Sequence, residues 1–219
     1  MGGWLYLIAD FSYGERKIQE ALAAGVDFIQ LREKGISSAE YLKRAKRLRE
    51  LTQGGGTKLI INDRLDIAML CGADGVHLGQ SDVPVRDARR LLGTEKIIGA
   101  TAKTVEQARQ AAADGADYLG SGAWFPTETK ADAVPISAEV YRAILANAPI
   151  PNVAVGGITA ENGCRPLACG ATGLAVSAGI LKADSPAREV RELRELISKS
   201  CKDRKKEEKY EDSAYDSRQ

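Results

Sequence analysis

Eight short apolar runs recur along the chain, and each is followed by a segment whose apolar residues have helical spacing. The runs alternate little between polar and apolar residues, which is typical of strands buried on both faces of a parallel sheet. They occupy residues 4–9, 27–31, 58–62, 74–78, 96–100, 117–122, 152–157 and 172–176. This rhythm predicts eight parallel strands alternating with helices, and therefore an α/β fold.

Two architectures can hold such a series, because right-handed crossovers give either an open doubly wound sheet or a closed (β/α)8 barrel. The count of eight and a length of 219 residues, near the lower barrel range, favour closure. A flavodoxin-like or Rossmann sheet is the alternative, but no G-x-G-x-x-G follows the first run. We predict a single-domain (β/α)8 TIM barrel over residues 1–199.

Several expected helices end in a Gly-Ala or Gly-Val pair directly before the next apolar run. The pairs occur in AAGVD, LCGADG, ADGADY and ACGATG. Glycine just past a helix adopts the left-handed conformation that caps it, so these pairs predict tight helix-to-strand turns.

The last twenty residues, 200–219, depart from this pattern, since six are basic, six are acidic and none of the run has a strong apolar stripe. Such a segment buries too little surface to offset its ordering entropy. We expect a charged C-terminal tail that is either disordered or a helical extension of the last element.

Charge and composition exclude several classes of protein. Thirty-one basic and 30 acidic residues leave a net charge of +1, which carries no global signature of nucleic-acid or membrane binding. No apolar run approaches the roughly 20 residues of a membrane-spanning helix, and the N-terminus lacks the basic start of a signal peptide. The four cysteines form no C-x-x-C pair and His77 is the only histidine, so we expect no structural zinc site and reduced thiols in a cytoplasmic protein.

In a (β/α)8 barrel the active site lies at the carboxyl ends of the strands, so the residues after each run are the candidates. After the second run, in-out alternation sends Gln30, Arg32 and Lys34 to one side. Two cations and an amide at a barrel mouth suit a phosphate or diphosphate, although a solvated strand end has the same composition.

Two carboxylates follow the third and fourth runs, at Asp63 and Asp82. Acidic residues from adjacent loops can share one hard cation, and magnesium takes one or two carboxylates together with water and phosphate oxygens. Each residue has a simpler interpretation, because either could cap the helix that follows it. The pair beside a cationic strand end nevertheless predicts a Mg2+ site.

The remaining strand ends offer hydroxyls, a further lysine and glycines. Thr101 follows the fifth run, and a long loop carrying Thr127, Thr129 and Lys130 follows the sixth. Loops of this length in compact domains are often functional. The last two runs end in glycine-rich turns, where such barrels bind phosphate with backbone N–H groups. The pattern therefore predicts two anion sites and an enzyme with two phosphorylated substrates.

Six segments together resemble the thiamine phosphate synthase family and occur in that family's order. They are QLREK (30–34), INDRLDIA (61–68), GADGVHLGQSD (72–82), GADYLGSGAWFPTETKADA (115–133), VAVGGIT (153–159) and GLAVSAG (173–179). The resemblance implies a (β/α)8 barrel, a magnesium cofactor and a transferase that joins a pyrimidine diphosphate to a thiazole phosphate. It implies small-molecule substrates as partners and leaves homo-oligomer formation open.

Carried over position by position, the resemblance implies a role for each candidate. The pyrimidine diphosphate would be held by Gln30, Arg32, Lys34, Asn62, Thr101 and Lys130. The thiazole phosphate would be held by Thr127, Thr129, Gly157, Val176 and Ser177. Asp63 and Asp82 would be the magnesium ligands. Arg32, Lys34, Thr101 and Lys130 would be catalytic, because they contact the departing diphosphate.

Two positions depart from the family pattern. Thr101 replaces the usual serine and keeps the hydroxyl, while Lys103 stands where many superfamily members have histidine. Two alternatives remain. One is a thiazole tautomerase or another phosphate-binding barrel isomerase, which Lys103 disfavours because a histidine is implicated there in the tautomerase. The other is a non-enzymatic ligand-binding regulator on the same scaffold. His77 lies within a buried run, so we expect it to be hydrogen-bonded in the barrel core and not catalytic.

Overall fold

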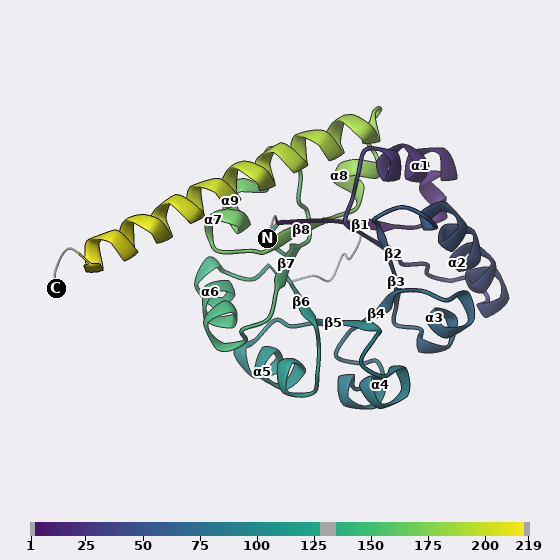
Figure 1. Cartoon of the computed structure of the whole chain (residues 1–219). Coiled ribbons are helices and arrows are strands. Elements are labelled where there is room, and N and C mark those ends of the chain that lie inside the picture. Colours follow the sequence, from purple (N-terminus) through teal and green to yellow (C-terminus); the bar gives the residue numbers. More distant parts are fainter. Residues whose placement is uncertain (1–2, 128–134, 217–219) are drawn as a thin grey trace.

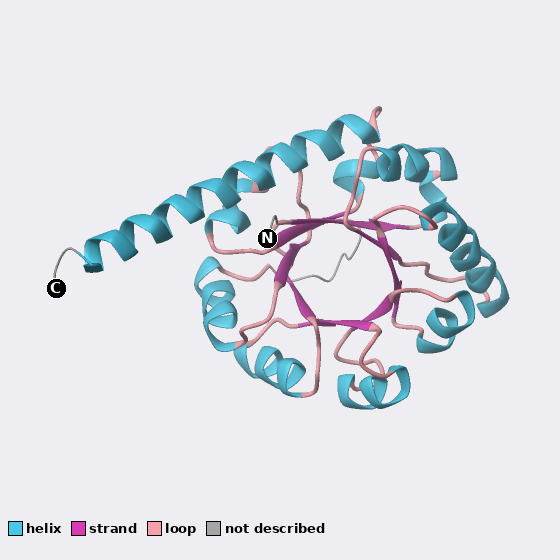
Figure 2. Ribbon diagram, in the orientation of Figure 1, coloured by secondary structure: helices cyan, strands magenta, loops and turns pink. Residues whose placement is uncertain are grey.

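Eight parallel strands close into a barrel in the order β1-β2-β3-β4-β5-β6-β7-β8, and the helices surround it (Figures 1 and 2). The structure is a computed structural model that describes residues 3–127 and 135–216, with side chains described to residue 202. The strands are β1 (Trp4–Ala9), β2 (Phe28–Leu31), β3 (Lys58–Asn62), β4 (Gly75–Leu78), β5 (Ile97–Thr101), β6 (Tyr118–Ser121), β7 (Asn152–Val155) and β8 (Gly173–Val176). The predicted barrel is confirmed, and every strand lies within one or two residues of its apolar run.

The connecting elements are one 3-10 helix and a series of α-helices. They are η1 (Phe11–Tyr13), α1 (Glu15–Ala23), α2 (Ser38–Thr52), α3 (Leu65–Cys71), α4 (Val85–Leu92), α5 (Val105–Ala113), α6 (Ala138–Asn147), α7 (Cys164–Ala168), α8 (Ala178–Leu181) and α9 (Pro186–Asp216). The sequence pattern missed α8, because four residues are too few to show a helical period. Of the two alternatives for the tail, residues 200–216 form the helix, as the end of α9, which continues past the barrel in Figure 1.

Two apolar layers hold the barrel together. The outer layer lies between strands and helices and includes Leu5, Leu7 and Ile29, which have no solvent exposure. The inner layer lies inside the barrel and is built on aromatic residues, with the ring of Tyr6 stacked on that of Phe28 at 5.4 Å between centroids. Because strand side chains alternate between the two faces, each strand feeds both layers.

A repeated contact closes the barrel at the amino ends of the strands. The residue directly before each even-numbered strand donates its backbone N–H to the carbonyl of one residue in the preceding strand. The side chain of the first residue accepts the backbone N–H of that strand residue in return. We call each such pair a clasp. The four clasps are Asp27–Leu5, Asp74–Leu59, Asp117–Ile98 and Thr172–Asn152. In each case the polar residue follows a Gly-Ala or Gly-Val pair whose glycine has positive φ, which confirms the predicted turns.

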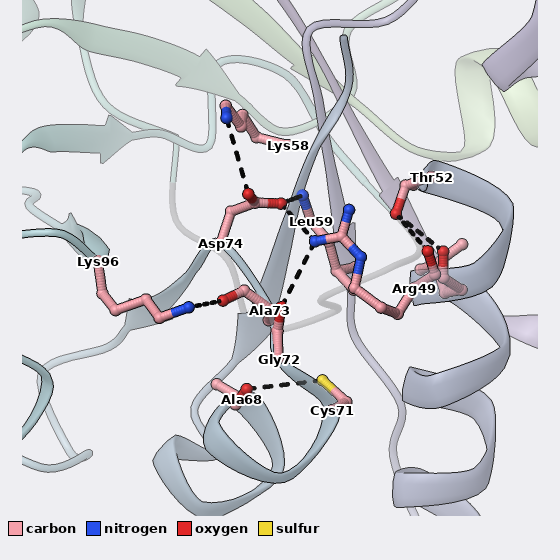
Figure 3. A network of polar contacts seen from close by, with 11 residues as sticks. Arg49, Thr52, Lys58, Leu59, Ala68, Cys71, Gly72, Ala73, Asp74 and Lys96 are labelled. Carbon is pink, nitrogen blue, oxygen red and sulfur yellow. Dashed lines mark hydrogen bonds and ion pairs between the residues drawn. The ribbon is translucent and has the colours of Figure 1, made fainter. Parts of the chain in front are cut away.

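The Asp74 clasp shows how the carboxylate is held (Figure 3). Its Oδ2 accepts from the Leu59 N–H and from Arg49 Nη1, both at 2.8 Å. Partial burial opposes ionisation, but these donors together hold the pKa of Asp74 below its usual value. Arg194 pairs with Asp27 and Arg89 with Asp117 in the same way. The three acidic clasps are therefore charge-compensated.

Replacing Asp74 with alanine is expected to lower the free energy of unfolding by about 2 kcal/mol, because the buried Leu59 N–H loses its acceptor. The lowered pKa means that this stabilisation is present above the unfolded-state value of about 3.9 and is lost as the pH falls through the folded-state value. Urea denaturation measures the effect. Asp74→Asn, which keeps an acceptor oxygen, should lose less, and kcat should be unchanged in both variants. An unchanged urea midpoint in Asp74→Ala would contradict the role of the clasp.

No helix among residues 3–127 and 135–216 is both long and apolar enough to cross a membrane. The same part of the chain contains no disulfide bond.

Candidate active site

A cavity of about 1060 Å³ opens at the carboxyl ends of the strands, and all eight strands or the loops that follow them contribute to its wall. This is the end of the barrel where the sequence placed the candidate residues. Most of them line the cavity: Gln30, Arg32, Lys34, Asn62, Asp63, Asp82, Thr101, Thr127, Gly157 and Ser177. Thr129 and Lys130 lie outside the described residues.

The end of β2 shows the predicted alternation. Gln30, Arg32 and Lys34 line the cavity. Glu33 points to the other side, where its Oε1 accepts from the Phe11 N–H at 3.0 Å and its Oε2 pairs with Arg44 at 2.9 Å. The acidic charge within this segment is therefore neutralised outside the cavity, and the two cations keep their charge available for an anion.

Two carboxylates meet where β3 and β4 end. Asp63 is the only described non-glycine residue with positive φ, at 63°, and its N–H donates to the His77 carbonyl at 2.9 Å. Strained backbone of this kind concentrates at functional sites. The Asp82 carboxylate accepts from the Gly79 N–H at 2.6 Å. Burial, followed by the hydrogen bond and the charge of Asp82, raises the pKa of Asp63 to about 6.

The local structure argues against the simpler interpretation of these carboxylates as helix caps. The N-cap of α3 is Arg64, with no side-chain capping bond, and the N-cap of α4 is Pro84. Asp63 and Asp82 instead face the cavity and each other.

The carboxylate pair has the chemistry of a magnesium site. Two carboxylates within hydrogen-bond reach repel when both are ionised, and a divalent cation between them removes that repulsion. No group of three or more His, Cys, Asp or Glu residues gathers as a metal site in the part of the chain that the structure describes. The pair alone is the ligand number that magnesium takes when water and phosphate oxygens complete its shell.

The ends of β7 and β8 form a region shaped by backbone. At Gly157, with φ of 64°, an added Cβ would lie 2.5 Å from the Pro126 carbonyl oxygen, so only glycine fits. Ser177 precedes the short helix α8 and lines the cavity. The side chain of Val176 is buried in the outer apolar layer, and Val176 is not among the residues that line the cavity.

Among the cavity residues that the sequence analysis did not assign to the site are three polar rings of the barrel interior. Tyr6, His77 and Tyr118 line the cavity floor. His77 is hydrogen-bonded as predicted, to Tyr118 Oη and to Thr101 Oγ1. Burial lowers its pKa to about 4, so the imidazole is neutral at pH 7. The signal available in the sequence was the inward register of these polar rings on β1, β4 and β6.

These observations define a class: a (β/α)8-barrel protein whose cavity presents cations, a carboxylate pair and glycine-rich backbone at the catalytic end. The thiamine monophosphate synthase family model matches residues 5–180, and the chain belongs to that family. It is accordingly an enzyme, a transferase.

Individual relatives agree with this membership. The thiamine-phosphate synthase of Clostridioides difficile is 44% identical over 191 residues, covering 85% of this chain and 91% of the relative. That of Moorella thermoacetica is 46% identical over 184 residues, covering 84% and 88%. The solved structure of the thiamine phosphate pyrophosphorylase from Pyrococcus furiosus is similar with a TM-score of 0.83 and 36% identity, covering 90% of this chain and 96% of that one.

Proposed function

We propose that this chain condenses 4-amino-5-hydroxymethyl-2-methylpyrimidine diphosphate with 4-methyl-5-(2-phosphooxyethyl)thiazole, giving thiamine phosphate and pyrophosphate. The observation that carries the proposal is the arrangement of one cavity. It combines a carboxylate pair and two cations on one side with glycine-rich backbone on the other. Two chemically different anion sites in one cavity suit two phosphorylated substrates.

The cationic side would hold the diphosphate. Arg32 and Lys34 offer donors to its oxygens, and Lys130 would add a third cation, as the family resemblance implies. Asp63 and Asp82 would hold Mg2+, whose positive charge, when bound, stabilises the departing diphosphate. The glycine-rich side would hold the thiazole phosphate through backbone N–H groups near Gly157 and Ser177.

The bond changes follow from this placement. The C–O bond between the pyrimidine methylene and the diphosphate breaks, and its electron pair leaves with pyrophosphate. The aminopyrimidine delocalises the positive charge that develops on the methylene carbon, so the step is dissociative. The thiazole nitrogen then donates its lone pair to form the C–N bond. A neutral nitrogen nucleophile carries no proton to be removed, so no protein general base is required.

The residues present disfavour the two alternative functions. A tautomerase or another isomerase has no departing diphosphate and gives no role to the carboxylate pair beside Arg32. A ligand-binding regulator has no need of a site that stabilises a leaving group. Lys103, which lines the cavity after β5, stands where the tautomerase has its implicated histidine.

The test is to incubate the purified chain with both phosphorylated substrates and Mg2+. Thiamine phosphate and pyrophosphate are then measured by mass spectrometry and a coupled phosphate assay. Both products should form in equal amounts and should disappear when either substrate is omitted or when EDTA is added. Absence of product, under conditions in which a known synthase turns over the same substrates, would overturn the proposal.

A further inference from the structure

A continuous chain of hydrogen bonds crosses the floor of the cavity and joins two of its predicted substrate contacts. Gln30 Nε2 donates to Tyr6 Oη at 2.9 Å, and Tyr6 Oη lies 2.8 Å from Tyr118 Oη. Tyr118 Oη lies 3.1 Å from His77 Nδ1, and His77 Nε2 lies 3.0 Å from Thr101 Oγ1. We call these five residues the floor chain. It links β2, β1, β6, β4 and β5 in that order.

The barrel interior is shaped to hold the rings of the floor chain. A Cβ at Gly99 would lie 2.1 Å from Tyr118 Cζ, and a Cβ at Gly120 would lie 3.0 Å from His77 Cε1. Tyr6 and Tyr118 are each 1% exposed and Gln30 is 3% exposed. Buried polar groups in a region of low dielectric must use their donors and acceptors, so the direction of each bond is constrained.

The direction can be followed from Gln30. Either phenol could donate in the bond between Tyr6 and Tyr118. Because Tyr6 Oη already accepts from the amide, the arrangement that also uses the Tyr6 proton has Tyr6 donating to Tyr118 Oη, its remaining partner among the described residues. The Tyr118 proton is then directed to His77 Nδ1. Burial raises the pKa of both phenols, so both keep their protons. An imidazole that accepts a hydrogen bond at Nδ1 has its own proton on Nε2, which His77 donates to Thr101 Oγ1.

We propose that the floor chain fixes the Thr101 hydroxyl as a hydrogen-bond donor aimed at the substrate diphosphate, which makes Tyr6, Tyr118 and His77 positioning residues. This rests on the proposed function, since it assumes that a diphosphate occupies the cavity beside Thr101. With one lone pair of Oγ1 taken by His77, the hydroxyl proton is left for an incoming anion. The Thr101 carbonyl is also held, because Gln80 Nε2 donates to it at 2.6 Å.

The direction of the chain has a direct spectroscopic readout. The protein has one histidine, His77, so ¹⁵N-histidine labelling gives a single imidazole whose tautomer can be assigned by NMR. At pH 7.5 we expect a protonated Nε2 and an unprotonated Nδ1. A protonated Nδ1 would mean that the hydrogen bonds of the floor chain run in the opposite direction. This would overturn the proposal, because Thr101 would then donate to His77 and not to the substrate.

A double-mutant cycle tests whether Tyr118 acts through Thr101. Tyr118→Phe is expected to lower kcat/KM for the pyrimidine diphosphate about tenfold, the loss of one oriented hydrogen bond to a charged group. KM for the thiazole phosphate should be unchanged. In a Thr101→Ala background, Tyr118→Phe should cause no further loss, whereas in Thr101→Ser it should still cause about a tenfold loss. An equal loss in the alanine and wild-type backgrounds would overturn the proposal.

Tyr141→Phe is the matched control for losing a buried phenol hydroxyl, because Tyr141 is 0% exposed and lies on α6, outside the floor chain. It should leave the His77 tautomer unchanged. A wild-type chain that forms no thiamine phosphate would overturn the proposed function. The tautomer would still decide the direction of the floor chain in that case, so the two failures are distinguishable.

Discussion

Asp63→Asn is expected to lower kcat by about 1,000-fold, which corresponds to about 4 kcal/mol of lost transition-state stabilisation. The pair formed with Asp82 provides the two anionic ligands of the proposed Mg2+ site, and asparagine removes one negative charge while keeping nearly the same shape. Burial and the neighbouring Asp82 carboxylate raise the pKa of Asp63 to about 6. Steady-state turnover at increasing Mg2+ concentration measures the change.

The companion variant Asp82→Asn should behave like Asp63→Asn, and both should require more Mg2+ for half-maximal turnover. Asp66→Asn is the matched control, because Asp66 lies in the first turn of α3 and pairs with Arg64 at the surface. It should keep the wild-type kcat. If Asp63→Asn retained normal turnover with an unchanged Mg2+ requirement, the carboxylate pair would not be the metal site.

Arg32→Met is expected to lower kcat/KM for the pyrimidine diphosphate by about 100- to 1,000-fold, the range observed when one preorganised charge-stabilising donor is removed. The backbone N–H of Arg32 donates to the Ala9 carbonyl at 2.9 Å, which fixes the end of β2. The Arg32 side chain lines the cavity, where its positive charge acts on the Asp63 carboxylate. The planar guanidinium can bind two phosphate oxygens at once. Initial rates with each substrate varied in turn separate the effect on the diphosphate from any effect on the thiazole phosphate.

Arg32→Lys distinguishes charge from shape, because it keeps the positive charge but loses the fork of donors. It should be intermediate between Arg32→Met and the wild-type chain. Arg86→Met is the control, since Arg86 lies on α4 and pairs with Asp114 away from the cavity. A loss in Arg32→Met that fell equally on both substrates would contradict a specific role at the diphosphate.

The strands were predictable because a parallel barrel buries both faces of each strand, which leaves continuous apolar runs such as 58–62, matched by β3 residue for residue. The alternation at the end of β2 was predictable for a similar reason. It depends on the local period of an extended chain, which Gln30, Arg32 and Lys34 obey. Roles that rest on family resemblance, such as those of Thr127 and Ser177, remain predictions with positions at the cavity.

The floor chain could not be predicted, because its contacts join residues distant in sequence. Tyr6 and Tyr118 are 112 positions apart, and His77 and Thr101 are 24 apart. Their meeting depends on strand register and on the space left by Gly99 and Gly120, which no local pattern encodes. The expectation for His77 was accordingly correct about its hydrogen bonds but did not place it at the cavity floor.

The four clasps divide the barrel into four two-strand modules, β1–β2, β3–β4, β5–β6 and β7–β8. Each clasp lies within one module and none crosses a module boundary. Adjacent modules are joined through backbone pairing, as in the register of Ile29 with Leu59. The polar residues that register each module thus lie at the end of the barrel away from the cavity. Loops at the catalytic end can therefore change in sequence and chemistry without disturbing the clasps that align the two strands within each module.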